Sequence, residues 1–257
     1  MAPTVRADAW LGVADLTPTD VAGRVVAVVD VLRASTTIAA ALAHGARAVI
    51  PCASTEDASL RAKTLSRADI LLAGEQRMRP IPGFDLGNSP ADYTAETVAG
   101  KTIVFTTTNG TPALLGVHSA GAADVVVAAY ANFSAILVLL RAALRGGTDI
   151  GILCAGHNGR FALEDAACAG SFLRELAEGV PDVLHNDAAL ACLAVERRYA
   201  AAGAATPTAI EASEHGRALA QEGFTGDLAV CATRDIFPVV PIYQDRQITK
   251  LGPDRSR

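Results

Sequence analysis

The stretch "VVAVVDVLRASTTIAAALAHGARAVIP", residues 25–51, decides the fold. An apolar, β-branched run at 25–30 is followed by an alanine-rich segment of helical period at 35–44, and a second β-branched run occupies 46–51. This order predicts a strand, a covering helix and a second strand, which is the repeating unit of a mostly parallel sheet.

The same alternation continues along the chain. Further helices are predicted at 55–65, 112–119 and 134–144, and further strands at 70–73, 102–107, 124–128, 149–154 and 228–231. Residues 164–221 are helical and strand-poor, and "LAVCATRDIFPVVPIY", residues 228–243, returns to strand and loop. The pattern predicts an α/β fold with a mostly parallel sheet layered with helices. No linker divides the chain, so we expect a single unit over 1–257. A division into two α/β subdomains near 130–160 is the alternative.

Composition limits the classes of partner. Hydrophobic residues make up 51% of the 257 residues, yet no apolar run approaches the roughly 20 residues that span a bilayer. The first residues lack the basic-then-apolar order of a secretory signal, so we expect a cytoplasmic protein without a membrane partner. A net charge of −5 without a lysine-arginine cluster argues against nucleic acid. A small molecule is the expected partner, and a homo-oligomer stays open.

Ligands of open parallel sheets bind beyond the carboxyl ends of the strands, so the polar residues there are informative. Asp30 ends the first predicted strand, Arg33 follows it, and Ser35 and Thr36 open the next helix. A carboxylate, a guanidinium and free helix amides suit a divalent metal and an anion. The alternative is a helix cap at Ser35 beside a surface ion pair.

A second strand end is unusually rich in hydroxyl groups. The stretch "IVFTTTNGT", residues 103–111, carries Thr107, Thr108, Asn109, Gly110 and Thr111 into a predicted helix. An ordinary helix start needs one capping side chain, and this segment supplies several more. Its hydroxyls, amide and backbone N–H groups predict a cradle for phosphate or sulfonate oxygens, and the alternative is a threonine-rich strand edge with a capping turn.

Two more segments follow predicted strands. "AGEQRMRPIPGFDLGNSP", residues 73–90, carries Glu75 and Arg77 into a Pro/Gly-rich loop of the kind that folds over active sites. "GILCAGHNGRFALEDAACAG", residues 151–170, carries a Gly-rich turn and then Glu164 and Asp165 at a helix start. The alternative explanation for residues 73–90 is a surface loop with a solvated charge cluster. The alternative explanation for Glu164 and Asp165 is that acidic residues interact favourably with the dipole at a helix start. Cys154 and His157 stay ambiguous, and the other histidines lack the spacing of a metal site.

The motifs "DVLRASTT", "GFDLGNSP", "TTTNGT" and "CAGHNGRFALEDAACAG", in this order, resemble the 2-phosphosulfolactate phosphatase family, known as ComB proteins. The resemblance covers most of the chain. It implies an α/β/α fold and a magnesium-dependent phosphatase that converts (R)-2-phospho-3-sulfolactate to (R)-3-sulfolactate and phosphate, a step of coenzyme M synthesis. Family members occur in bacteria that make no coenzyme M, so a related small phosphorylated hydroxy acid stays open as the substrate.

Together, the strand ends and the resemblance give the candidate site. Its catalytic candidates are Asp30, Arg33 and Asn109. Its metal candidates are the oxygen donors that Mg²⁺ prefers, namely Asp30, Glu75, Glu164 and Asp165. Its substrate-binding candidates are Ser35, Thr36, Asn88, Thr107, Thr108, Gly110, Thr111 and Asn158. One departure from the family pattern is Gln76, which stands where we expect an arginine and leaves the role of Arg77 open.

Three other classes compete with this hypothesis. Haloacid-dehalogenase phosphatases carry a second aspartate two residues after the first, and here that position is Leu32. A dinucleotide-dependent oxidoreductase needs G-x-G-x-x-G, which "GHNGRF" does not match. A non-catalytic phosphoester-binding protein on the same scaffold stays open. Because Leu32 cannot act as an acid, we favour attack by water with Asp30 as a metal ligand over an aspartyl-phosphate.

Overall fold

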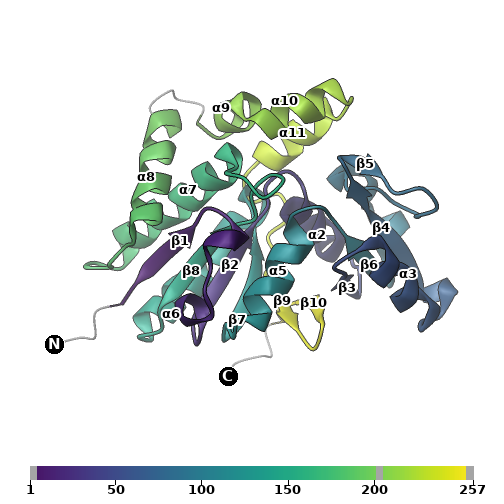
Figure 1. Ribbon diagram of the computed structural model, residues 1–257, viewed down its shortest axis with the longest axis horizontal. Coiled ribbons are helices and arrows are strands. Elements are labelled where there is room, and N and C mark those ends of the chain that lie inside the picture. Colours follow the sequence, from purple (N-terminus) through teal and green to yellow (C-terminus); the bar gives the residue numbers. More distant parts are fainter. Residues whose placement is uncertain (1–4, 201–204, 253–257) are drawn as a thin grey trace.

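A computed structural model describes residues 5–200 and 205–252, and its strands form one ten-stranded sheet (Figure 1). The order across the sheet is β1-β8-β2-β7-β9-β10-β3-β6-β4-β5. In chain order the strands are β1 (Ala7–Trp10), β2 (Val25–Val29), β3 (Ala48–Pro51), β4 (Ile70–Gln76), β5 (Arg79–Pro80), β6 (Thr102–Thr106), β7 (Asp124–Ala128), β8 (Ile150–Cys154), β9 (Pro241–Gln244) and β10 (Gln247–Lys250).

The sheet consists of two parallel sets joined by a hairpin. Strands β1, β8, β2 and β7 pair in parallel, and so do β3, β6 and β4. The antiparallel hairpin β9–β10 lies between the sets and pairs with β7 on one side and with β3 on the other. Five of the nine pairings are therefore parallel, with a short antiparallel edge at β5, which confirms the predicted mostly parallel sheet.

Helices cover both faces of the sheet. They are α1 (Pro18–Val21), α2 (Ala34–Ala43), α3 (Thr55–Lys63), α4 (Ala95–Val98), α5 (Gly110–Ser119), α6 (Phe133–Arg145), α7 (Leu163–Gly179), α8 (Asp187–Ala200), α9 (Ala205–Ala212), α10 (Glu214–Gln221) and α11 (Thr225–Ala232). Successive side chains of a strand point to opposite faces. Thus Val25, Ala27 and Val29 join a core with α6 and α7, whereas Val26 and Val28 join a second core with α2 and α5. The α/β/α layering is confirmed.

Most predicted elements are confirmed within a few residues, but the strand at 228–231 is wrong. These residues belong to α11, where Asp227, Leu228 and Cys231 are buried while Ala229 is exposed. That spacing is helical, and an apolar run of four residues is too short for its period to be distinguished from that of a buried strand. Three strands, β1, β5 and β10, lie where no strand was predicted.

The C-terminal helices lie beyond one end of the sheet. Figure 1 shows α9, α10 and α11 grouped at the top of the view, between α7 and the short strand β5. All five cysteines are buried and free, as predicted. Among the helices of the described residues, none is long and apolar enough to cross a membrane.

Candidate active site

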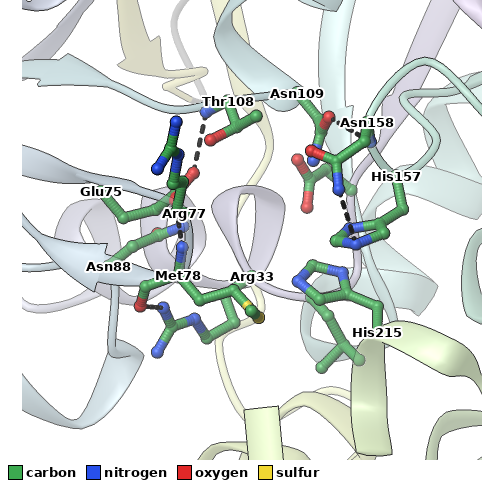
Figure 2. Close-up of a pocket in the computed structure, with 12 residues that line it drawn as sticks. Arg33, Glu75, Arg77, Met78, Asn88, Thr108, Asn109, His157, Asn158 and His215 are labelled. Atoms are coloured by element: carbon green, nitrogen blue, oxygen red, sulfur yellow. Dashed lines mark hydrogen bonds between the residues drawn. The ribbon is translucent and has the colours of Figure 1, made fainter. Parts of the chain in front are cut away.

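A pocket of about 100 Å³ opens where β2, β4 and β6 end. Figure 2 shows the side chains that converge on it from both sides. Its lining comes from the strand ends, from the turn after β4, from the turn after β8 and from α10, and consists of Asp30, Leu32, Arg33, Glu75, Arg77, Met78, Asn88, Thr108, Asn109, His157, Asn158 and His215. Seven of the predicted site residues are therefore brought together: Asp30, Arg33, Glu75, Asn88, Thr108, Asn109 and Asn158.

Asp30 is held at the tip of β2 by the start of α2. Its N–H donates to Ser35 Oγ at 2.9 Å, and its Oδ1 accepts the Ala34 N–H at 3.3 Å. Gly110 passes so close that a Cβ there would lie 2.6 Å from Oδ2 of Asp30. Burial raises the pKa of the Asp30 carboxyl to about 6, although His215 acts in the opposite direction. Ser35 and Gly110 thus support Asp30 rather than line the pocket.

Glu75 ties two loops of the pocket together. Its Oε1 accepts the Thr108 N–H at 2.8 Å, and its Oε2 accepts the Met78 N–H at 2.8 Å. Both bonds are drawn in Figure 2. The carboxylate therefore fixes the loop after β6 against the tight turn between β4 and β5.

Arg33 lines the pocket, but its charge already has a partner. One guanidinium nitrogen lies 2.7 Å from Oδ2 of Asp227, and another donates to the Met78 carbonyl at 2.8 Å. The ring of Phe224 lies 4.3 Å from the Arg33 Cζ, and the Ser89 hydroxyl donates to the other Asp227 oxygen at 2.6 Å. The side chain of Arg33 is thus fixed by α11 and by the β4–β5 turn.

Arg77 and Asn88 carry polar groups that are not engaged. Arg77 lies in the β4–β5 turn with a φ of 53°, and no ion pair or hydrogen bond of its side chain is found among the described residues. Asn88 is 4% exposed, and its Oδ1 is buried without a hydrogen-bond partner in the described part of the chain. The pocket therefore offers a free cation and a free amide oxygen.

The threonines after β6 divide into two groups. Thr107 and Thr111 bond to each other, since the Thr107 N–H donates to Thr111 Oγ1 at 3.0 Å and the Thr111 N–H donates to Thr107 Oγ1 at 3.1 Å. Both side chains are buried at the start of α5, whereas Thr108 faces the pocket. Thr36 is fully buried and donates to the Val31 carbonyl at 3.0 Å. Thr36, Thr107 and Thr111 thus lie outside the pocket lining and shape the loops behind it.

Asn109 connects the loop after β6 with the turn after β8. Its Oδ1 accepts the Asn158 N–H at 2.9 Å, and the Asn158 Nδ2 lies 2.9 Å from Nε2 of His157. Burial, followed by the neighbouring His215, lowers the pKa of His157. The rings of the two histidines are 4.1 Å apart at their centroids, tilted by 32°.

The paired acids at the start of α7 have different environments. Asp165 accepts the Val31 N–H at 2.9 Å and the Gly156 N–H at 3.1 Å, and it is not among the residues that line the pocket. Burial raises the pKa of Asp165 well above its usual range, and the Glu164 charge adds to this effect. Glu164 instead faces an adjoining cavity of about 420 Å³, which shares His157, Asn158 and His215 with the first.

The oxygen donors of the pocket fit Mg²⁺, which keeps several waters and takes only one or two protein carboxylates. No group of three His, Cys, Asp or Glu side chains among the described residues is arranged to hold a metal. Asp30 and the unpartnered Oδ1 of Asn88 do line the same pocket. This donor set suits a hard, mostly hydrated ion rather than zinc or another ion held by a dedicated cage.

Sequence reasoning missed His215 and Asp227, which come from α10 and α11. His215 is presented by the segment "SEHG", residues 213–216, in which Ser213 Oγ accepts the Gly216 N–H at 2.9 Å and caps α10. A Cβ at Gly216 would lie 2.0 Å from the Ile210 carbonyl oxygen, so glycine lets α10 pack closely on α9. A capped helix start that carries a histidine beside a glycine was the available signal.

Comparison with known proteins identifies the class. The family model described as 2-phosphosulpholactate phosphatase matches residues 12–246. A relative from Symbiobacterium thermophilum is 39% identical over 232 residues, covering 90% of this chain and 96% of its own. A relative from Thermotoga maritima is 37% identical over 218 residues (85% and 88%), and one from Clostridium novyi is 32% identical over 248 residues (96% and 100%). Each is named "Probable 2-phosphosulfolactate phosphatase".

The α/β/α fold, the polar pocket at its strand ends and these relatives define a phosphoric monoester hydrolase. The chain belongs to the 2-phosphosulfolactate phosphatase family. The resemblance predicted from the four motifs is confirmed.

Proposed function

We propose that this protein is a Mg²⁺-dependent phosphatase of 2-phospho-3-sulfolactate or of a closely related small phosphorylated hydroxy acid. The observation that carries the proposal is the buried carboxylate of Asp30, which shares one pocket with the cation of Arg77, a side chain without a partner in the described part of the chain. The names of the relatives support the substrate class.

Some residues of the pocket contact the substrate, and others hold the loops that carry these residues. Arg77 and Asn109 contact the anionic groups of the ester, because both residues line the pocket. Asn109 and Asn158, joined by a 2.9 Å hydrogen bond, hold the two facing loops at the spacing that the substrate needs. Arg33 fixes the turn that carries Arg77 through its bond to the Met78 carbonyl.

Asp30 and Asn88 would hold the metal, whereas Glu164 and Asp165 are engaged by His215 and by backbone amides. Bound Mg²⁺ supplies charge that offsets the negative charge of the phosphoryl oxygens. Asp30 acts as a ligand and not as the nucleophile, and a water molecule attacks phosphorus in line with the leaving oxygen. Stoichiometric ³²P label on a peptide containing Asp30 after acid quenching would contradict this assignment.

The test is phosphate release from a panel of small phosphoesters, with Mg²⁺ and after exhaustive chelation. We expect the highest kcat/KM for short 2-phosphorylated acids that carry a second anionic group, and hydrolysis only when Mg²⁺ is present. Binding of these esters by calorimetry without any phosphate release would favour the alternative, a non-catalytic phosphoester-binding protein.

A further inference from the structure

Phosphate-monoester hydrolysis releases an alkoxide, which leaves readily only if it is protonated as the bond to phosphorus breaks. Position 32, where a neighbouring acid would stand in haloacid-dehalogenase enzymes, is Leu32 and cannot supply that proton. Of the carboxyl and imidazole groups that line the pocket, Asp30 is assigned to the metal and both oxygens of Glu75 accept backbone N–H groups, which leaves two histidines, His157 and His215.

His215 and Glu164 form a buried pair at the junction of the two cavities. Nδ1 of His215 lies 3.3 Å from Oε1 of Glu164, and the two side chains are 9% and 2% exposed. His215 lines both cavities, whereas Glu164 lines only the adjoining one. Figure 2 shows the His215 ring extending into the pocket next to the ring of His157.

The orientation of the ring follows from this contact. A hydrogen bond from one ring nitrogen of histidine to a carboxylate sets the tautomer, and Oε1 of Glu164 is the carboxylate oxygen that lies 3.3 Å from Nδ1 of His215. Nε2 of His215 has no hydrogen-bond partner among the described residues, so this atom is available to a ligand. His157 differs, because its Nε2 is taken by the Asn158 amide and its Nδ1 is buried without a partner.

A purely structural role explains this arrangement poorly. Burying a carboxylate costs free energy unless all of its oxygens are bonded, yet Oε2 of Glu164 has no hydrogen-bond partner in the described residues. An apolar pair would fill the same space without that cost. Unpartnered buried groups that converge on a ligand cavity are typical of catalytic sites.

We propose that His215, oriented by Glu164, is the general acid of the reaction; this inference rests on the proposed phosphatase function. The Nε2–H proton of His215 passes to the ester oxygen as the P–O bond breaks, and the alcohol leaves. The attacking water forms the new P–O bond and loses one proton, which restores the protonated imidazole, so the products are the alcohol and hydrogen phosphate. Glu164 is a positioning residue.

The test compares 2-phospholactate with 3,3,3-trifluoro-2-phospholactate, whose more acidic alcohol leaves without a proton donor. In His215→Asn we expect kcat for 2-phospholactate to fall by about 10²–10⁴-fold, and kcat for the fluorinated ester to fall by less than about tenfold. In Glu164→Gln, kcat for 2-phospholactate should also fall more than kcat for the fluorinated ester, but by a smaller factor than in His215→Asn. His118→Asn is the matched control, because His118 is exposed and contacts Tyr243, away from the pocket.

If His215→Asn lowers kcat equally for both esters, or changes KM alone, the role of His215 as general acid is overturned, while the phosphatase function stays intact. If the wild-type protein with Mg²⁺ hydrolyses neither ester nor any member of the panel, the proposed function itself fails. Thermal unfolding of each variant checks folding, and His215→Gln replaces His215→Asn if the latter does not fold.

Discussion

Arg33 and Asp227 are 194 positions apart in the sequence, and a 2.7 Å ion pair joins them next to the pocket. Both side chains are buried, so the pair is costly to break from one side only. Because Asp227 neutralises Arg33, we expect an anionic substrate to be attracted mainly by Arg77, whose side chain has no partner among the described residues.

Arg77→Ala should therefore raise KM for the best phosphoester by about tenfold or more, since it removes a charge-assisted contact worth about 1.5–3 kcal/mol. The folded protein should keep its thermal midpoint, because Arg77 is exposed. Arg79→Ala is the matched control, because Arg79 begins β5 directly after this turn and pairs with Glu222.

Arg33→Ala should behave differently, because it leaves Asp227 buried without its cation. We expect a loss of stability of about 3–5 kcal/mol, measured by urea unfolding, together with weaker substrate binding through the displaced turn. A variant that loses substrate binding while keeping wild-type stability would mean that Arg33 contacts the substrate directly.

Gly110→Ala should reduce activity by displacing Asp30, since the added Cβ would lie 2.6 Å from its Oδ2 and 2.7 Å from Ala34 Cβ. We expect kcat/KM to fall by about tenfold or more, as misplacement of a catalytic group by about 1 Å can cost about 10²-fold. Gly226→Ala is the control, because nothing lies within 4 Å of a Cβ there. Similar kinetics for both variants would contradict the close approach.

Exhaustive chelation should abolish hydrolysis, and Mg²⁺ should restore it. Burial raises the pKa of Asp30 to about 6, so a proton competes with the metal for this carboxylate. Mg²⁺ affinity, measured by calorimetry, should therefore fall as the pH drops through about 6. Full activity after chelation would remove the metal from the mechanism.

Asp8→Asn should destabilise the protein at neutral pH. Asp8 lies 2.9 Å from Arg6 and 2.8 Å from Arg24, and although burial acts to raise the pKa of Asp8, the hydrogen bonds of the two arginines lower it below 3.8. Because the folded-state pKa is depressed, the stabilisation is present above pH 3.8 and is lost as the pH falls through the folded-state value.

At pH 7 we expect a loss of about 1–3 kcal/mol in the free energy of unfolding, discounted because Arg6 is partly exposed. The difference between wild type and variant should narrow below pH 3.8. If the difference in the free energy of unfolding between wild type and Asp8→Asn does not change with pH, the effect of the substitution comes from packing instead.

The site residues at the ends of strands could be predicted from the sequence, whereas the site residues on helices that pack from a distant part of the chain could not. Asp30 and Asn109 were found because each follows a β-branched strand, and residues that follow parallel strands gather at the ligand-binding edge. His215 and Asp227 belong to helices whose periodicity identifies a buried face without revealing what that face covers. Thr107 and Thr111 follow β6 as predicted, but they hydrogen-bond to each other, which a hydroxyl-rich motif cannot reveal.

The hairpin β9–β10 has a consequence for how the protein is made. It joins the two parallel sets of strands, yet it is formed by residues 241–250, which are synthesised after all the other strands of the sheet. While these residues are still inside the ribosome, β7 and β3 lack the strands that connect them, and their edges stay open. Completion of the sheet therefore has to follow synthesis of all its other strands, and unpaired strand edges are open to chaperones and to aggregation during that interval.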